Sequence, residues 1–161
     1  MTNKKPHLLW VVNTPVFGGL EKFTLNLLAH LDGFVHTLAV TAQSELARRA
    51  RMLPHCAVRE LPLPRKLGRW RGWEVLMPAR SAKITALLDA AIAAAAADNP
   101  APLVIFQTFQ EKFIGTPLAR RRNCRVLWVE HGPLPTWLTA NPLLLNLYRT
   151  RAALTQGIVA V

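Results

Sequence analysis

The sequence lacks several features that define common classes of protein. Its two cysteines, Cys56 and Cys124, lie far apart and outside any Cys-x-x-Cys pair. This spacing predicts neither a zinc site nor a disulfide framework, and reduced thiols are expected. No apolar run approaches the length that crosses a bilayer, and the run near the N-terminus is too short for a signal peptide. We therefore expect a cytoplasmic protein, or one that rests peripherally on the inner membrane face.

Acidic residues are also scarce. Nine aspartates and glutamates stand against 20 lysines and arginines, which gives a formal net charge of +11 and a pI near 11.1. Such an excess attracts anionic partners, whether nucleic acid, acidic membrane or phosphorylated small molecules, and charge alone does not choose among them. Because no nucleic-acid-binding motif is present, no nucleic acid is expected as a partner.

The motifs of several enzyme classes are missing as well. The chain has no G-x-G-x-x-G turn, which argues against a dinucleotide dehydrogenase, and no G-x-x-x-x-G-K-[ST], which argues against a P-loop NTPase. The G-x-S-x-G elbow of serine hydrolases is absent too. No two histidines have metal-ligand spacing on a clear helix face, so no metal site is expected.

What the chain does contain is a regular alternation of two patterns. Short apolar runs predict buried strands at 8–12, 34–40, 58–61, 103–106, 125–129 and 158–161. Apolar residues at helical spacing predict helices at 20–31, 44–53, 79–97 and 142–154, and a further helix start is expected within 107–112. With 161 residues, 51% of them hydrophobic, the range 1–161 is expected to form a single domain. The predicted fold class is α/β, with a doubly wound, mostly parallel, Rossmann-like sheet.

A glycine turn, Gly18-Gly19-Leu20-Glu21, joins the first strand to the first helix. Adjacent glycines let the backbone turn sharply and let a ligand approach the main chain closely. The free N–H groups of the first helical turn then favour a negative charge, and Lys22 is a weaker candidate for a phosphate contact. The alternative is an ordinary helix start in which Glu21 complements the helix dipole.

The strongest candidate for chemistry is His131, which follows the strand predicted at 125–129. Gly132 and Pro133 predict a sharp turn after it, and functional groups collect at the carboxyl edge of a parallel sheet. A histidine here can bond a hydroxyl or a phosphate at physiological pH. Glu130 adds a carboxylate, although adjacent strand residues face opposite ways, so the two side chains need not touch. The alternative is a structural histidine that ties the turn together.

The order of these motifs resembles the acceptor half of the GT-B glycosyltransferases of family 4. That family has a Gly-Gly-x-Glu turn after its first strand, as at 18–21, and a histidine-glycine turn near the end of the domain, as at 129–132. The stretch 148–161 is similar to the family's last helix and strand. Gln107 or Thr108 stands where a histidine is common in the family.

This resemblance implies the N-terminal half of a GT-B fold and a retaining transfer of sugar from a nucleotide sugar to a glycan or lipid-linked acceptor. It also implies no metal and no tightly held cofactor. Gly18 and Gly19 would lie against the donor diphosphate or the acceptor, His131 near the transferred sugar, and Glu130 beside it as a second catalytic candidate. Because GT-B enzymes hold most of the nucleotide site on a second domain, we expect a donor domain in cis or in trans, and little transfer by these 161 residues alone.

An alternative function is a non-catalytic, basic α/β module that recruits a partner subunit or an anionic membrane. The segment Arg65–Met77 bears on this choice, because it has no clean period and interleaves basic residues with Trp70 and Trp73. Such a segment can meet phosphate, a sugar face or a membrane interface. It can equally be a surface loop whose tryptophans pack on the core.

Overall fold

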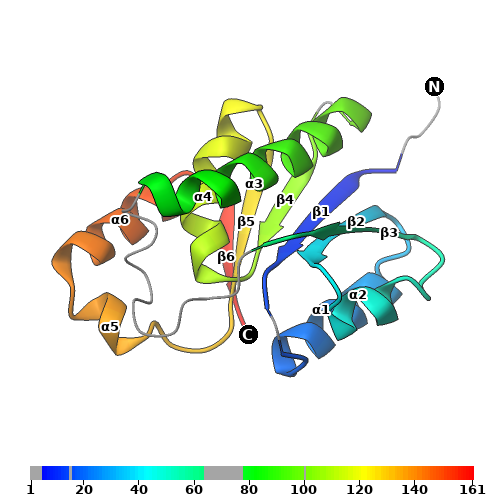
Figure 1. Cartoon of the computed structure of the whole chain (residues 1–161), viewed down its shortest axis with the longest axis horizontal. Coiled ribbons are helices and arrows are strands. Elements are labelled where there is room, and N and C mark those ends of the chain that lie inside the picture. Colours follow the sequence, from blue (N-terminus) through cyan, green and yellow to red (C-terminus); the bar gives the residue numbers. More distant parts are fainter. Residues whose placement is uncertain (1–4, 15, 64–77, 100) are drawn as a thin grey trace.

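A computed structural model describes residues 5–14, 16–63, 78–99 and 101–161 of the chain. Six strands form one parallel sheet in the order β3-β2-β1-β4-β5-β6 (Figure 1). This order, with its reversal at β1 and β4, confirms the predicted doubly wound, Rossmann-like α/β fold. The segment Arg65–Met77 lies outside the described residues, so neither interpretation of it is tested. The strands are β1 (His7–Val12), β2 (Val35–Thr41), β3 (Cys56–Leu61), β4 (Leu103–Phe106), β5 (Arg125–Glu130) and β6 (Gly157–Ala160).

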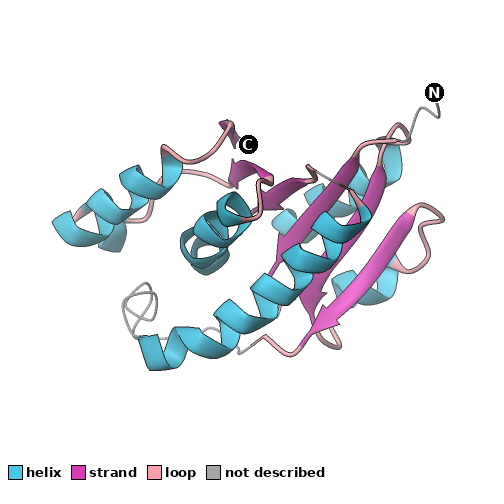
Figure 2. Cartoon of the chain, turned by 90° about the horizontal axis from the view of Figure 1, so that it is seen from above, coloured by secondary structure: helices cyan, strands magenta, loops and turns pink. Residues whose placement is uncertain are grey.

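Helices cover both faces of the sheet (Figure 2). Because successive side chains of a strand point to opposite faces, Trp10 of β1 packs toward α1 and α2, whereas Leu9 packs toward α3 and α4. Both residues are buried, as expected for a central parallel strand with helices on either side. None of the helices described here has the length and apolar character needed to span a bilayer. The helices are α1 (Gly19–His30), α2 (Glu45–Ala50), α3 (Pro78–Asp98), α4 (Phe109–Arg121), α5 (Thr136–Thr139) and α6 (Pro142–Ala152).

The predicted element boundaries agree with the structure to within two residues, with three exceptions. Helix α2 ends at Ala50 rather than Leu53, because the chain tightens there into turns in which Met52 N–H bonds to Arg49 C=O and Leu53 N–H to Ala50 C=O. Helix α4, predicted only as a start, runs on to Arg121. The short α5 was not predicted, since its four residues carry no helical period.

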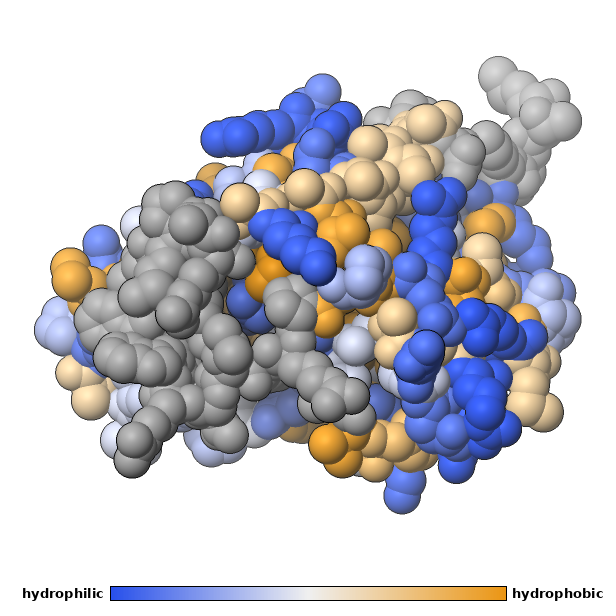
Figure 3. Space-filling view, viewed as in Figure 1, coloured by the Kyte–Doolittle hydropathy of each residue, from blue (hydrophilic) through white to orange (hydrophobic). Residues whose placement is uncertain are grey.

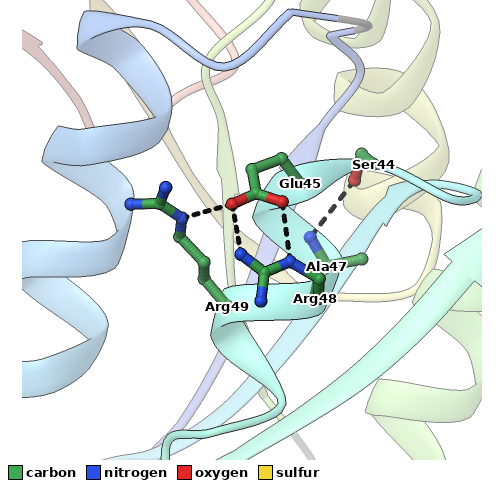
Figure 4. A network of polar contacts seen from close by, with 5 residues as sticks. All are labelled: Ser44, Glu45, Ala47, Arg48 and Arg49. Atoms are coloured by element: carbon green, nitrogen blue, oxygen red, sulfur yellow. Dashed lines mark hydrogen bonds and ion pairs between the residues drawn. The ribbon is translucent and has the colours of Figure 1, made fainter.

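Helix α2 pairs both of its arginines with its one carboxylate. Its N-cap is Ser44, whose Oγ accepts the N–H of Ala47 at 3.2 Å (Figure 4). The carboxylate of Glu45 accepts two hydrogen bonds from Arg48, at 2.6 and 2.7 Å, and one from Arg49 at 2.6 Å. The hydrogen bonds from these arginines lower the pKa of Glu45 to about 2. Two of the chain's arginines are therefore paired within one short helix.

Helix α4, which carries several side chains of the site described below, packs tightly on the sheet. A Cβ atom on Gly115 would lie 2.4 Å from the ring of Phe106, so the helix approaches β4 more closely than any other residue allows. On the neighbouring strand, Trp128 Nε1 donates a hydrogen bond to Thr116 Oγ1 at 2.9 Å. Gly115 and Pro117 both weaken a helix interior, so tertiary packing rather than helix propensity maintains α4.

Candidate functional site

Polar side chains come together where the central strands end. Asn13 follows β1, Gln107 and Thr108 follow β4, and Glu130 and His131 lie at the end of β5. The winding of the sheet reverses between β1 and β4, and ligands of open α/β sheets bind at the carboxyl edge near such a point. The topology therefore places His131 at the edge predicted from the sequence.

A buried carboxylate fixes the strand ends relative to α4. Glu111 is 0% exposed, and its Oε1 accepts a hydrogen bond from the side-chain amide of Asn13 at 2.7 Å. The other carboxylate oxygen accepts from the hydroxyl of Thr108. Asn13 Oδ1 in turn accepts from Thr41 Oγ1 at 2.9 Å, which adds β2 to the network. Burial of this charge is tolerated because both carboxylate oxygens have donors.

A cavity of about 210 Å³ opens beside these strand ends. Binding sites for drug-sized ligands run to ~300–1,000 Å³, so this one has room for a single small group and not for a whole nucleotide sugar. Two larger hollows lie elsewhere, one of about 440 Å³ between α3 and α4 and one of about 460 Å³ beside the starts of β2 and β3. The lining of the small cavity is polar at Gln107, Thr108, Lys112, Glu130, His131 and Tyr148, and mainly apolar at Leu20, Phe109, Gly132, Pro133, Leu134 and Pro135.

One wall of the cavity is built around Glu130. Lys112 Nζ lies 2.7 Å from Glu130 Oε1 and also donates to the backbone carbonyl of Val129 at 2.7 Å. The hydroxyl of Tyr148 donates to Glu130 Oε1 at 3.0 Å. Desolvation, followed by the negative charge of Glu130, raises the pKa of Tyr148, so its hydroxyl stays protonated. Glu130 Oε1 is thus committed to two donors of the protein itself, which hold the carboxylate in place.

His131 is held from two sides. Its Nε2 lies 3.0 Å from Gln107 Oε1, and its ring meets the ring of Phe23 edge-on with the centroids 5.3 Å apart. The next residue, Gly132, has a φ of 98°, which is the left-handed region that favours glycine. The sharp turn predicted after His131 is therefore confirmed.

The charged groups around His131 act on it in opposite directions. Desolvation by partial burial of the imidazole lowers the pKa of His131, and the positive charge of Lys112 lowers it further. The carboxylates of Glu130 and Glu21 oppose this shift and do not outweigh it. His131 is therefore neutral at neutral pH.

The glycine turn lines the cavity only through Leu20, and neither of its glycines does so. The N–H of Gly18 donates to Glu21 Oε2 at 2.6 Å, and Glu21 is only 4% exposed. This carboxylate takes one of the N–H groups that a phosphate would use, as expected of a helix start complemented by an acidic residue. Gly19 and Lys22 are exposed, and Leu20 is the residue of this turn that reaches the cavity. Phosphate binding by Gly18, Gly19 and Lys22 stays a prediction.

Within the described ranges, no group of three histidine, cysteine, aspartate or glutamate side chains is arranged to hold a metal ion. The two cysteines are free thiols. Desolvation raises the pKa of both, that of Cys56 to about 11, so neither forms a reactive thiolate at neutral pH.

Sequence reasoning did not single out two residues of the cavity wall. Lys112 lies in the first turns of a helix, where a lysine is normally solvated, yet its side chain is 3% exposed. Tyr148 is the only tyrosine of the chain and follows the buried Leu144 by four residues, which places both on one face of α6. That spacing was the available signal for Tyr148, whereas nothing local marks Lys112.

No protein-family model matches the sequence, and the search of curated proteins gave no match. Solved structures do resemble it. A UDP-glucosyltransferase from Polygonum tinctorium, capable of glucosylating indoxyl, is similar with a TM-score of 0.56 and 18% identity over 82% of this chain and 30% of that chain. The N-terminal domain of Candida albicans trehalose-6-phosphate phosphatase is similar with a TM-score of 0.58 and 15% identity, over 96% of this chain and 40% of that chain.

At such identities these likenesses show the fold alone, which is Rossmann-like and glycosyltransferase-like. The chain also spans less than half the length of either structure. An activity of the longer proteins therefore reaches this chain only as a proposal.

Proposed function

We propose that the chain is the acceptor-binding half of a retaining GT-B glycosyltransferase of family 4, which moves a sugar from a nucleotide sugar to a glycan or lipid-linked acceptor. The observation that carries this proposal is the small cavity at the carboxyl ends of β4 and β5, where a neutral His131 faces a polar wall on a glycosyltransferase-like fold.

The lining of the cavity suits a sugar. A sugar ring offers hydroxyls that both donate and accept hydrogen bonds, together with apolar C–H faces. The carboxylate of Glu130 and the imidazole of His131 can accept from hydroxyls, while Leu20 and Phe109 supply apolar surface. The volume admits one small group, so the nucleotide would lie outside, on a donor domain supplied in cis or in trans.

The proposed roles follow from these positions. His131 contacts the transferred sugar or the attacking acceptor, and Glu130, held by Lys112 and Tyr148, shapes the wall beside it. Gly18 and Gly19 lie against the donor diphosphate or the acceptor, and Lys22 is a weaker candidate for a phosphate contact. The nucleotide sugar is a co-substrate, and no metal or bound cofactor is required by this scheme.

The first experiment measures binding by NMR on the 161-residue chain. UDP-glucose, GDP-mannose and simple glycosides are titrated at millimolar concentration against the isotope-labelled protein. We expect backbone shifts at 131–134 and at Leu20, which line the cavity, and none at the distant His55. Saturable binding that leaves the cavity resonances unmoved, or no binding of any of these probes, would overturn the proposal.

The second experiment measures transfer with the donor domain present. Replacing His131 by alanine is expected to lower kcat/KM by about 100- to 1,000-fold, the usual effect of losing one hydrogen-bonding group at a reacting centre. The matched control is His55→Ala, an exposed histidine at the start of β3. Near-normal turnover by His131→Ala would remove this residue from the site.

A second candidate function, the basic module for an anionic membrane, rests on the distribution of charge. Hydrophilic side chains gather over the end of α4 at the top of Figure 3. In that region Arg121 and Arg125 form no ion pair within the described part of the chain, whereas Arg48 and Arg49 are paired with Glu45. Unpaired cations near a surface contribute about 1 kcal/mol each to binding of anionic lipid.

A vesicle-pelleting assay tests this candidate. If the membrane function is correct, vesicles rich in phosphatidylserine bind the chain at low salt, and high salt releases it. Arg121→Gln with Arg125→Gln then weakens binding more than the matched pair Arg48→Gln with Arg49→Gln. Equal effects of the two pairs would mean that the chain binds vesicles through its overall net charge, and that Arg121 and Arg125 do not form a docking site.

A further inference from the structure

Three hydrogen bonds connect His131, through Gln107 and Thr24, to the backbone of helix α1. The donor and the acceptor of each bond can be assigned by starting at the α1 end. The backbone carbonyl of Leu20 can only accept a hydrogen bond, and the hydroxyl of Thr24 lies 2.9 Å from it. The hydroxyl therefore donates its single proton to this carbonyl. The Thr24 oxygen is then free to accept, and Gln107 Nε2 lies 2.9 Å away. The side-chain amide of Gln107 is thereby oriented with Oε1 toward His131.

The last bond of the chain fixes the proton on His131. Gln107 Oε1 lies 3.0 Å from His131 Nε2 and is an acceptor, so Nε2 must carry the hydrogen. The neutral imidazole then has its lone pair on Nδ1. No hydrogen bond formed among the described residues uses this second nitrogen.

The reverse direction is disfavoured by the same contacts. It would require the Gln107 amide to turn so that Nε2 faces His131, and Thr24 would then have to donate to Gln107 Oε1 and abandon the carbonyl of Leu20. Thr24 is 0% exposed and Gln107 is 4% exposed, so bulk water cannot replace a hydrogen-bond partner that either side chain loses.

We propose that Gln107 is a positioning residue that holds His131 as the Nε2–H tautomer, so that Nδ1 accepts a hydrogen bond from a sugar hydroxyl. This inference rests on the proposed function and names the ligand chemistry of its cavity. The phosphodiester groups of a nucleotide-sugar diphosphate carry no proton at neutral pH, so they offer only acceptors and find no donor at Nδ1 of the neutral ring. Of the two partners that the sequence left open for His131, the hydroxyl fits this tautomer and the phosphate does not.

The neighbours of His131 support a neutral ring. The charged side chains that act on it come from three elements, Lys112 of α4, Glu130 of β5 and Glu21 of α1. Desolvation and Lys112 together lower the pKa of His131 against the two carboxylates. An imidazolium would donate from both nitrogens and would lose the discrimination between a hydroxyl and a phosphate.

The test reads the tautomer directly. Long-range proton–nitrogen NMR correlations on protein with isotope-labelled histidine show which ring nitrogen is protonated. At neutral pH we expect one neutral species, protonated at Nε2, for His131. The variant Gln107→Leu loses this single-tautomer signature, while Gln110→Leu, the same change on a residue of α4 outside the hydrogen-bonded chain, keeps it. An Nδ1–H species or a cation in the unmodified protein, or an unchanged signature in Gln107→Leu, would overturn the proposal.

Two further measurements keep the inference testable if Gln107→Leu does not fold. Thr24→Val keeps the shape of the side chain but removes the hydroxyl, so the Gln107 amide loses its orientation and the tautomers are expected to mix; an unchanged spectrum contradicts the relay. Methyl glucoside should shift the Nδ1 resonance and dimethyl phosphate, a diester without a P–OH group, should not, and a response to dimethyl phosphate alone contradicts the choice of a hydroxyl. If the Nε2–H tautomer holds and the glucoside does not bind, the proposed function fails while the positioning role of Gln107 stands.

Discussion

The side-chain amide of Asn13 donates a hydrogen bond to the carboxylate of Glu111 at 2.7 Å, across 98 positions of sequence. Because Glu111 is 0% exposed, its charge depends on such donors for the solvation that water would otherwise give. The contact joins the end of β1 to the first turns of α4. It thereby fixes the relative positions of two elements that frame the candidate site.

Replacing Asn13 by leucine is expected to lower the free energy of unfolding by about 2–3 kcal/mol. The change removes one donor from the buried Glu111 and one acceptor from Thr41, and an unsatisfied buried group costs about 1–3 kcal/mol, more when it is charged. Urea denaturation followed by circular dichroism measures the loss. Asn26→Leu, on the exposed side of α1, is the matched control and should change stability little. Equal losses in the two variants would contradict the role of Asn13.

The pair formed by Lys112 and Glu130 is expected to show coupling in a double-mutant cycle. Lys112→Met leaves the Glu130 carboxylate without its cation, which should cost about 2–3 kcal/mol, below the ~3–5 kcal/mol of a fully buried pair because Glu130 is 19% exposed. Adding Glu130→Gln removes the stranded charge and should restore part of the loss. Chemical denaturation of the two single variants and the double variant gives the coupling, and strict additivity would show that the two side chains act independently.

Gly115→Ala is expected to destabilise the protein by about 1–3 kcal/mol, although alanine is the better helix former. The added Cβ would lie 2.4 Å from the Phe106 ring, which is fixed within the core and cannot move aside cheaply. Gly19→Ala is the matched control, because a Cβ there meets no atom within 4 Å. A thermal melt of both variants tests this, with Gly115→Ala expected to melt lower and Gly19→Ala at or above the unmodified protein. The reverse order would mean that α4 can shift away from β4.

The depressed pKa of His131 gives stability a specific dependence on pH. A histidine of the unfolded chain titrates near pH ~6.5, and the folded value is lower because of desolvation and Lys112. Protonation of His131 is therefore harder in the folded state than in the unfolded chain. The contribution of the neutral ring to the free energy of unfolding is fully present above the unfolded pKa and is lost as the pH falls through the folded pKa.

Comparison with His131→Gln isolates this contribution. The unmodified protein should lose stability relative to the variant between neutral pH and mild acid, and an NMR titration of the His131 ring should give a midpoint below the ~6.5 of histidine in an unstructured peptide. A midpoint at or above that of the peptide would contradict the assigned environment.

Much of the fold could be predicted because the period of the apolar residues is a local property. The apolar run at 103–106 predicted β4 with the bounds that the structure shows. The apolar residues at helical spacing within 20–31 predicted α1 to within one residue at each end. Where local signals conflicted, prediction was weaker. Gly115 and Pro117 read as helix breakers, yet α4 continues through both because its packing on β4 and β5 compensates.

The site was predicted in part. The turn at His131 follows from the adjacent Gly132 and Pro133, which the sequence shows directly. The contacts of Lys112 and Tyr148 with Glu130 were not predicted, since each of the two residues lies 18 positions from Glu130 along the chain. A lysine on an amphipathic helix has no local mark that tells a buried ion pair from a solvated charge.

The sequence by itself determined the alternation of strands and helices, the excess of positive charge and the position of a histidine after a buried strand. These follow from composition and from periods of a few residues. Only the tertiary structure decided that Gln107, Lys112 and Tyr148 meet at His131 and Glu130, and that the charge of Glu111 is balanced by hydrogen bonds. Strand order and helix packing bring these groups together across long stretches of chain, and no short pattern encodes contacts of that range.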